Sequence, residues 1–382
     1  MKLLLITDGI SPFVIGGMQK HSANIARFMV ERGHEVTVVH CVPHGTSLPT
    51  EEEVKTALSL PPFASITSIV LHFPQPAWYP GHYLKESYAY SVKIYQKLKG
   101  QWDEFDFIYA KGFSAWRLIE AKRKGEKMPP IGVKFHGYEM FQKAQTFNLW
   151  LQHQLLQGPT KWNSVNADYV FSYGGQISEI AERIGVAKNK IIELPSGIEL
   201  SWIKQDRVVS DRIRFVFVGR FERRKGVEEL NQALQALSPE LQYEFHFIGP
   251  IPPSARLSDS RITYHGEIKD KNQILSIIDS CNVLVAPSHS EGMPNVILEG
   301  MSRGCAILTT LVGAVPILVD EGSGWFVKPG DAVDLKNQLI RILEIGPEGV
   351  HLKGVHALTR ISESFTWEKV AERLEKMLLS RL

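Results

Sequence analysis

The chain has 382 residues, of which 44% are hydrophobic and 22% charged, and its formal net charge is +2. This length exceeds one ordinary hydrophobic core and predicts two domains, while the composition excludes a disordered, fibrous or membrane-spanning chain. The small net charge argues against nucleic-acid binding, which needs clustered Lys and Arg. The three cysteines form no C-x-x-C pair, and no apolar run reaches the ~18 residues of a membrane helix or resembles a signal peptide. We therefore expect a cytoplasmic protein, in solution or at the inner face of the membrane.

The first half of the chain carries the apolar pattern of an α/β domain. Residues 2–7 predict a buried strand, residues 18–32 have apolar side chains at helical spacing, and residues 34–42 are again β-branched and apolar. This order is that of a Rossmann-like unit, although the dinucleotide fingerprint G-x-G-x-x-G is absent. Further parallel strands are predicted at residues 107–110, 131–135 and 169–172.

The same order recurs in the second half. Residues 213–218 predict a strand, residues 226–237 a helix and residues 243–249 another strand. The stretch 195–212, which mixes Pro, Gly, Ser and charge, is interpreted as the interdomain linker. More strands are predicted at 283–287, 306–310 and 324–327, followed by helices at 331–345 and 366–381.

The sequence SEGMPNVILEGMSRG, residues 290–304, predicts a helix that follows a strand, with Pro294 in its first turn and Gly304 just past its end. A helix N-terminus presents unpaired N–H groups and partial positive charge. We therefore expect its first residues to cradle a phosphate, namely Met293, Pro294, Asn295 and Val296.

Two carboxylates accompany this helix. Glu291 precedes it and Glu299 lies inside it, and eight residues at ~1.5 Å each place them up to ~12 Å apart. That distance suits opposite ends of a sugar nucleotide and is too long for one acid/base pair. The alternative is a pair of solvent-facing glutamates on an ordinary helix.

Several cations follow the first strand of the second half, in VGRFERRKGVEEL, residues 218–230. A departing nucleoside diphosphate gains negative charge, so preplaced cations stabilise the transition state more than the ground state. Arg220 and Lys225 are the candidates for this role. Arg223 and Arg224 are interpreted as pointing to water.

The first half offers two weaker signals. Gly16 and Gly17 precede a predicted helix and allow a close backbone approach to an anion, although such a pair is often only a turn. His136 sits where a predicted strand ends, the place where α/β sheets bind ligands. A structural role for this histidine is the alternative.

Taken together, these motifs resemble family 4 of the glycosyltransferases, also described as glycosyl transferases group 1, over nearly the whole chain. The family's G-G loop is matched by Gly16 and Gly17, its G-R-x-x-x-x-K-G segment by residues 219–226 and its E-x7-E by Glu291 and Glu299. The closing stretch FTWEKVAERLEKML resembles the family's final helix, which returns to the first domain.

The resemblance implies an α/β chain of the GT-B fold, with two Rossmann-like domains whose parallel sheets face each other across a cleft. An acceptor-binding domain is expected at residues 1–198, with residues 366–382 packing back on it, and a nucleotide-sugar-binding domain at residues 199–365. By resemblance, Glu291 and His136 would contact the donor sugar, Glu299 the ribose, and Arg220 with Lys225 the diphosphate.

The resemblance further implies a retaining hexosyltransferase in polysaccharide or glycoconjugate biosynthesis that needs neither a protein nucleophile nor a metal. The sequence has no D-x-D pair and no His/Cys ligand cluster, so no cofactor is expected. The donor is expected to be UDP-glucose or a related UDP-hexose, and the acceptor a saccharide or lipid-linked glycan.

The acceptor and two other functions stay open at this point. Residues 43–62 and the aromatic, lysine-containing stretch 76–100 are candidates for acceptor or peripheral membrane contact, although an amphipathic surface helix is the simpler interpretation of the latter. A sugar-nucleotide epimerase of the same fold is one alternative function. A non-enzymatic, two-lobed sugar-binding protein is the other.

Overall fold

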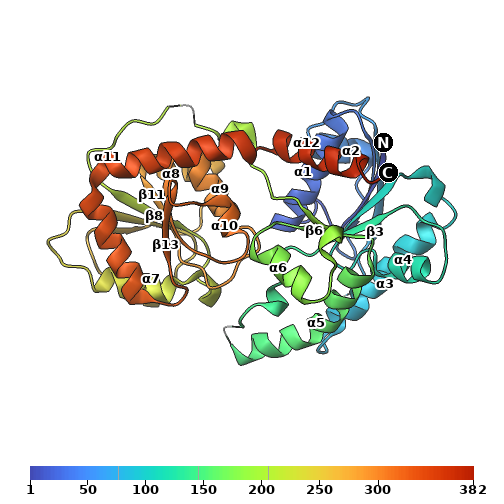
Figure 1. Ribbon diagram of the computed structural model, residues 1–382, viewed down its shortest axis with the longest axis horizontal. Coiled ribbons are helices and arrows are strands. Elements are labelled where there is room, and N and C mark those ends of the chain that lie inside the picture. Colours follow the sequence, from blue (N-terminus) through green and yellow to red (C-terminus); the bar gives the residue numbers. More distant parts are fainter. Residues whose placement is uncertain (76, 145, 205) are drawn as a thin grey trace. The chain divides into compact units, whose positions relative to one another are not determined.

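The computed structural model describes residues 1–75, 77–144, 146–204 and 206–382 (Figure 1). The chain forms two compact units. Unit 1 contains Met1–Pro195 together with Val370–Leu382, and unit 2 contains Ser196–Lys369. Each unit is an α/β domain built on one parallel sheet, as the sequence predicts.

Unit 1 has a seven-stranded sheet in the order β3-β2-β1-β4-β5-β6-β7. All neighbouring strands are parallel, which requires a crossover connection after each one. The order reverses between β1 and β4, as in a doubly wound fold. The strands are β1 (Lys2–Ile6), β2 (Glu35–Val42), β3 (Ile66–His72), β4 (Phe107–Lys111), β5 (Ile131–Lys134), β6 (Tyr169–Ser172) and β7 (Ile191–Glu193).

The helices of unit 1 cover this sheet and include the end of the chain. Glu375 of α12 forms ion pairs with Arg32 and His34, which follow α1. The two chain termini therefore belong to the same unit (Figure 1). The helices are α1 (Gly17–Glu31), α2 (Glu51–Ala57), α3 (His82–Leu98), α4 (Trp116–Arg123), α5 (Phe147–Asn166), α6 (Gln176–Arg183) and α12 (Trp367–Leu379), with short 3-10 helices such as η2 (Glu139–Phe141).

Unit 2 repeats the architecture with six parallel strands in the order β10-β9-β8-β11-β12-β13. Here the order reverses between β8 and β11. The strands are β8 (Arg214–Val218), β9 (Glu244–Ile248), β10 (Ile262–Tyr264), β11 (Val283–Ala286), β12 (Ala306–Thr310) and β13 (Gly324–Val327). The helices are α7 (Val227–Gln235), α8 (Lys271–Ser280), α9 (Asn295–Ser302), α10 (Val315–Leu318) and α11 (Ala332–Ser364), the last of these interrupted at Gly346.

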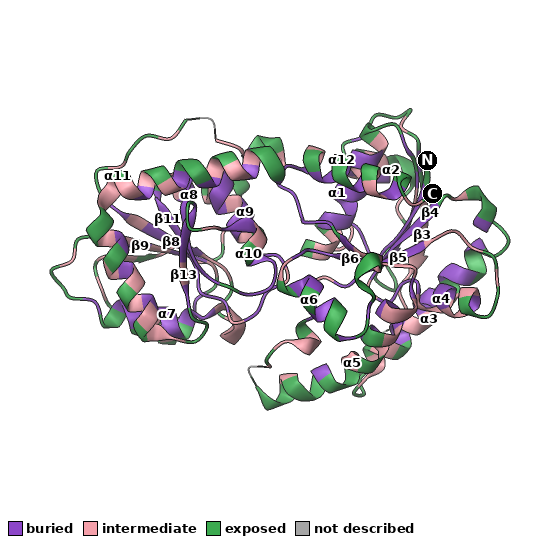
Figure 2. Cartoon of the chain, viewed as in Figure 1, coloured by how far each residue is buried: buried purple, intermediate pink, exposed green. Residues whose placement is uncertain are grey.

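The central strands of both sheets are buried, because helices cover their two faces (Figure 2). In unit 2, apolar side chains of α7 and the first part of α11 pack with β8, β9 and β11 on one face. On the opposite face Gly300 of α9 lies against Leu284 of β11, where an added Cβ would come within 3.0 Å of that side chain. The core thus fixes where the strand ends and their loops lie.

The stretch interpreted as a linker packs largely on unit 2. The division between the units falls at Pro195, and the Lys204 amide donates to the Ser302 carbonyl at 3.0 Å. Gln205, within the same stretch, lies outside the described residues. The segment after Ser196 is therefore an outer layer of unit 2 rather than a free connection.

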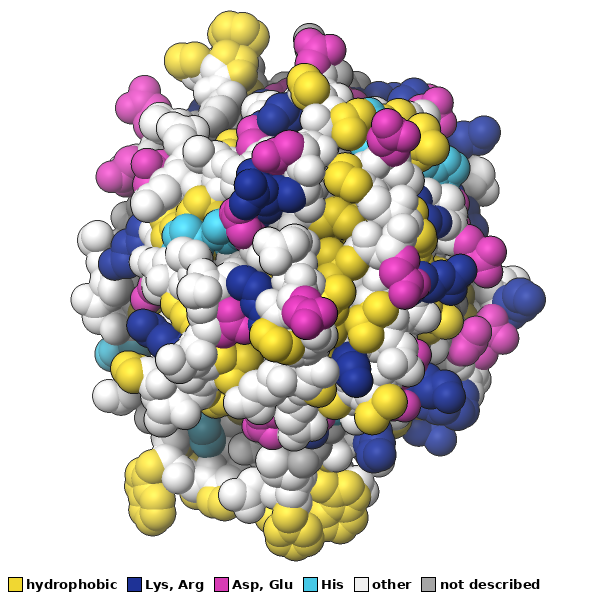
Figure 3. Space-filling view, turned by 90° about the vertical axis from the view of Figure 1, so that its left-hand side faces the viewer, with side chains coloured by type: hydrophobic (Ala, Val, Ile, Leu, Met, Phe, Trp, Pro, Cys, Tyr) yellow, Lys and Arg dark blue, Asp and Glu magenta, His cyan; other side chains and the backbone are white. Residues whose placement is uncertain are grey.

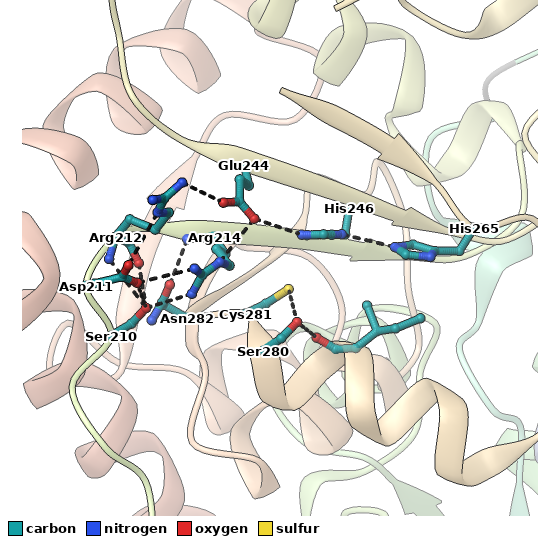
Figure 4. Close-up of polar contacts among 11 residues, drawn as sticks. Ser210, Asp211, Arg212, Arg214, Glu244, His246, His265, Ser280, Cys281 and Asn282 are labelled. Carbon is teal, nitrogen blue, oxygen red and sulfur yellow. Dashed lines mark hydrogen bonds and ion pairs between the residues drawn. The ribbon is translucent and has the colours of Figure 1, made fainter. Parts of the chain in front are cut away.

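A polar network closes the amino-terminal edge of the sheet in unit 2 (Figure 4). Arg214 at the start of β8 pairs with Glu244 at the start of β9, Nε to Oε2 at 3.1 Å, and its amide donates to Asn282 Oδ1 at 2.7 Å. His246 and His265 extend this network, with His246 Nδ1 lying 3.0 Å from His265 Nε2. This edge is opposite to the strand ends that lead into the loops of the candidate site.

Candidate active site

The candidate residues of unit 2 lie at the reversal point of its sheet. Arg220 and Lys225 follow β8, and Glu291 follows β11, the two adjacent strands between which the strand order changes direction. In open α/β sheets the loops diverge at this point and leave a crevice beyond the carboxyl ends of the strands, where ligands bind.

A chain of ion pairs joins these residues. Lys225 Nζ lies 2.6 Å from Glu291 Oε1, and Arg224 approaches the other oxygen at 3.4 Å. Glu222 links Arg224, at 2.8 Å, to Arg220, at 2.9 Å. The structure therefore brings Lys225 and Glu291 into direct contact, whereas Arg220 reaches them through Glu222 and Arg224 and its side chain is 70% exposed.

Glu291 is the buried centre of this network. Its side chain is 9% exposed, and it accepts a hydrogen bond from Ser288 Oγ at 2.9 Å in addition to the two cations. A buried carboxylate is costly unless it is paired and hydrogen-bonded, and both conditions are met here. The carboxylate is thus held in place before any ligand arrives.

Gly226 allows the two loops to approach. Its φ is +69°, and a Cβ added there would lie 2.1 Å from the carbonyl oxygen of Pro287. The adjoining contact is a hydrogen bond from the His289 amide to the Arg224 carbonyl at 2.7 Å. Only glycine permits this approach, which sets Lys225 against Glu291.

Gly226→Ala is therefore expected to reduce the free energy of unfolding by ~2–4 kcal/mol, measured by denaturant unfolding. Gly266→Ala is the matched control, because Gly266 has a φ of +70° but nothing within 4 Å of an added Cβ. The control should cost only ~1 kcal/mol. Equal losses in the two variants would show that the approach to Pro287 carries no energetic weight.

The interpretation of Arg223 and Arg224 as solvated side chains is wrong. Arg223 pairs with the buried Glu229 of α7 through two contacts at 2.5 and 2.8 Å, and its NH1 lies 2.7 Å from His289 Nε2. Arg224 takes part in the network around Glu291. Glu229 lies six residues from Arg223 in the sequence, and Glu291 lies 67 residues from Arg224. The local pattern of cations therefore gave no sign of these ion pairs.

Helix α9 begins at Asn295, and Pro294 is its N-cap rather than a residue of its first turn. No side chain caps this N-terminus and no acidic residue lies in its first turn. Pro294 has no N–H, so any phosphate cradle must use the amides of the neighbouring residues Met293, Asn295 and Val296. Glu299 lies in the middle of α9 and is half-buried.

In unit 1 the glycine pair opens α1 directly. Gly17 is its first residue and Gly16 its N-cap, and no side chain caps this end. His21, one turn into the helix, lies with its ring centroid 5.7 Å from that of His136. The structure therefore brings the start of α1 and the end of β5 together within unit 1.

His136 sits among buried polar side chains. Its Nδ1 is 2.6 Å from the hydroxyl of Tyr173, which follows β6. Lys111 and Lys134 end the neighbouring strands β4 and β5 as register partners, and both are buried. Burial, with the charges of these lysines, holds the pKa of His136 well below its usual range, so the imidazole is neutral.

Within the sequence stretch 76–100, residues His82–Leu98 form α3, a helix with one buried face. Tyr90 and Tyr95 of α3 are buried, and the Tyr95 ring stacks on Trp102. Two of its aromatic residues thus pack in the core, as expected for an amphipathic surface helix, while Trp78, Tyr79 and Tyr83 are exposed. Pro76 lies outside the described residues.

An open groove of about 590 Å³ lies between η2 and the first turns of α5. Its walls combine the stacked rings of Phe147 and Trp150 with amide side chains of Gln142, Gln154 and Gln157. No sequence motif pointed to this groove, because it arises from a loop and a helix that only the fold places side by side.

Surface charge, helix length and the grouping of metal-ligating side chains bear on the partners of the chain. On the face in Figure 3, Lys and Arg are interspersed with Asp and Glu without a continuous field of one sign. Within the described ranges, no helix is long and apolar enough to cross a membrane. The same residues contain no group of three or more His, Cys, Asp or Glu placed to hold a metal ion.

Family models match both units. Residues 15–202 match the model described as Glycosyltransferase Family 4, and residues 212–344 match that described as Glycosyl transferases group 1. Together with the two parallel sheets, these matches define a glycosyltransferase of the GT-B type. The chain belongs to family 4 of the glycosyltransferases, the group 1 enzymes, as its motifs indicate.

Two curated relatives show how far the similarity extends. The putative teichuronic acid biosynthesis glycosyltransferase TuaC of Bacillus subtilis is 27% identical over 46% of this chain and 47% of its own length, so this chain spans about half of that relative. The MMP alpha-(1->4)-mannosyltransferase of Mycolicibacterium hassiacum is 21% identical over 93% of this chain and 92% of its own length.

Solved structures share the fold over the whole chain. Sucrose-phosphate synthase from Thermosynechococcus elongatus aligns with a TM-score of 0.75 and 18% identity, covering 100% of this chain and 98% of that one. Anabaena HepE, solved in complex with UDP-glucose, aligns with a TM-score of 0.68 and 16% identity over 100% of both chains. At these identities the likeness concerns the fold.

Proposed function

We propose that this chain is a retaining glycosyltransferase that moves a hexosyl group from a UDP-sugar to a hydroxyl of a saccharide or lipid-linked glycan, in polysaccharide or glycoconjugate biosynthesis. The observation that carries the proposal is the Lys225–Glu291 pair at the β8/β11 reversal point of a family 4 chain. HepE is solved with UDP-glucose, and TuaC is named for teichuronic acid biosynthesis, which supports the donor and the pathway class.

The roles in unit 2 follow from charge. Lys225 and Arg220 are proposed to receive the diphosphate, whose negative charge grows as its bond to the sugar breaks. The amides at the start of α9 would hold a phosphate oxygen, and Glu299 would accept from the ribose hydroxyls. When the ammonium of Lys225 pairs with the diphosphate instead of Glu291, the Glu291 carboxylate becomes available to accept a hydrogen bond from the donor sugar.

The roles in unit 1 concern the sugar and the acceptor. We propose that the start of α1 at Gly16 and Gly17 approaches the donor phosphate and that His136 contacts the donor sugar. The groove at η2 and α5 supports a saccharide acceptor, because aromatic faces and amides suit the apolar faces and hydroxyls of sugars. The leaving phosphate itself would take the acceptor proton, so no protein nucleophile and no metal is required.

A donor and acceptor panel tests the proposal. Thermal unfolding with UDP-, GDP- and ADP-sugars identifies the donor, since a ligand at ~100 times its Kd adds ~2.7 kcal/mol of stability. Saccharide acceptors with and without a lipid are then offered in EDTA, and nucleoside diphosphate release and the glycosylated product are followed. Isomerised sugar nucleotide without transfer, or activity restored only by magnesium or manganese, would refute the proposal.

Glu299→Ala is expected to weaken binding of the free nucleoside diphosphate by ~1.5–3 kcal/mol, because its proposed partner is the ribose. Isothermal titration calorimetry with UDP measures this loss. Glu240→Ala, an exposed glutamate of the same unit, is the control and should bind as the wild type. An unchanged affinity in Glu299→Ala for the nucleotide that the wild type prefers would remove Glu299 from the site.

A further inference from the structure

The contact between Tyr173 and His136 determines which imidazole nitrogen carries the proton. Tyr173 is buried, and its hydroxyl lies 2.6 Å from His136 Nδ1. His136 Nε2 is buried and has no hydrogen-bond partner within the part of the chain that the structure describes. The other nitrogen of this ring therefore remains for a ligand.

Two arrangements of protons are compatible with this distance. In the first, the phenol donates to an unprotonated Nδ1, and His136 carries its proton on Nε2. In the second, Nδ1–H donates to the phenol oxygen, and both the phenol proton and the bare Nε2 are left without a partner. The first leaves one buried polar group unsatisfied and the second leaves two, and each such group costs ~1–3 kcal/mol.

The surroundings favour a phenol that keeps its proton and a ring that stays neutral. Burial raises the pKa of Tyr173 far above its usual range. Lys134 Nζ lies 3.8 Å from the centre of the Tyr173 ring and donates to the Leu194 carbonyl at 2.7 Å, which fixes the ring between two strand ends. Lys111 Nζ lies 2.8 Å from His21 Nδ1, and burial, with the proximity of this lysine, lowers the pKa of His136 well below its usual range.

We propose that Tyr173 is a positioning residue that holds His136 in the Nε2–H form, so that His136 donates a hydrogen bond to an oxygen of the donor and does not act as a base. The inference rests on the proposed function for the identity of that oxygen. It deepens that function by assigning the direction of the hydrogen bond. A hydrogen-bond donor at this position would stabilise the growing negative charge on the departing phosphate, or would bind a hydroxyl of the sugar.

Nuclear magnetic resonance measures the tautomer directly. Long-range proton–nitrogen correlation of the ¹⁵N-histidine-labelled protein separates protonated from bare ring nitrogens, and His136→Gln identifies the signal among 13 histidines. The expected result is a protonated Nε2 and a bare Nδ1 in the wild type. In Tyr173→Phe the two nitrogens should move towards averaged values. A bare Nε2 in the wild type overturns the proposal.

Kinetics provide the second readout. Tyr173→Phe is expected to lower kcat about tenfold, with less than about a twofold change in KM for the donor. Tyr109→Phe is the matched control, since Tyr109 is a buried tyrosine of the same sheet whose hydroxyl has no partner among the described residues. It should keep wild-type kcat. Thermal unfolding is used to verify that both variants are folded. Equal kcat values in Tyr173→Phe and Tyr109→Phe would then overturn the positioning role.

The two readouts separate this inference from the proposed function. A wild type with protonated Nε2 that turns over no sugar nucleotide refutes the function and leaves the tautomer assignment standing. An active transferase with a bare Nε2 refutes the tautomer assignment alone.

Discussion

Replacing Lys225 by alanine is expected to lower kcat by ~30- to 1,000-fold, equivalent to ~2–4 kcal/mol of transition-state stabilisation. The ammonium group lies at the reversal point of the unit 2 sheet, 2.6 Å from Glu291, where a departing diphosphate would gain charge. Because that charge develops during the reaction, the loss should appear in kcat more than in KM. Arg220→Ala should act in the same direction. Steady-state release of nucleoside diphosphate measures both effects.

The control for these variants is Arg212→Ala. Arg212 is an exposed cation of the same unit that pairs with Glu244 at the amino-terminal edge of the sheet (Figure 4). It should keep wild-type kcat. A kcat of Lys225→Ala within about twofold of this control would exclude Lys225 from stabilising the leaving group.

His136→Ala is expected to lower kcat by about 100-fold while leaving the Kd for free nucleoside diphosphate unchanged. Apart from the start of α1 at Gly16 and Gly17, the nucleotide-binding groups that we propose belong to unit 2, whereas His136 belongs to unit 1 and is proposed to contact the sugar. The variant removes the imidazole that we propose donates to the sugar donor and whose Nδ1 lies 2.6 Å from the Tyr173 hydroxyl. Calorimetry measures the Kd, and donor turnover measures kcat.

His246→Ala is the matched control, because His246 is also half-buried and its Nδ1 is likewise hydrogen-bonded to a side chain, that of His265. It should turn over the donor as the wild type does. If His136→Ala weakens nucleotide binding tenfold without a change in kcat, His136 binds the nucleotide instead of the reacting sugar.

The sequence predicted the central strands of both sheets and the edge strand β13, because these strands are continuous apolar runs. Residues 169–172, 306–310 and 324–327 form β6, β12 and β13 as predicted. The edge strands β3, β7 and β10 were missed, since ITSIVLH is only partly buried and the others have three residues each. The helix after Gly346 was missed as well, because Pro347 ends a helical pattern in the sequence although the chain continues helical beyond it.

The candidate site could be predicted only where a local motif carries it. Lys225 and Glu291 were found from their motifs, but their contact depends on Gly226 passing the Pro287 carbonyl, a fact of the fold. Glu229 and Tyr173 were missed for the same reason. Glu229 lies in an ordinary helix and Tyr173 just after a strand. Their contacts with Arg223 and His136 form only when the chain folds.

The stereochemistry of donor turnover is the most direct test of whether the chain is a retaining, nucleotide-sugar-dependent transferase. The wild-type chain is incubated in EDTA with the α-linked UDP-hexose that stabilises it most, and the anomeric protons of released or transferred sugar are followed by NMR before mutarotation. The α-anomer is expected to appear first, together with an equal amount of UDP. Appearance of the β-anomer first, or no nucleoside diphosphate release from any sugar nucleotide in the panel, would contradict this function.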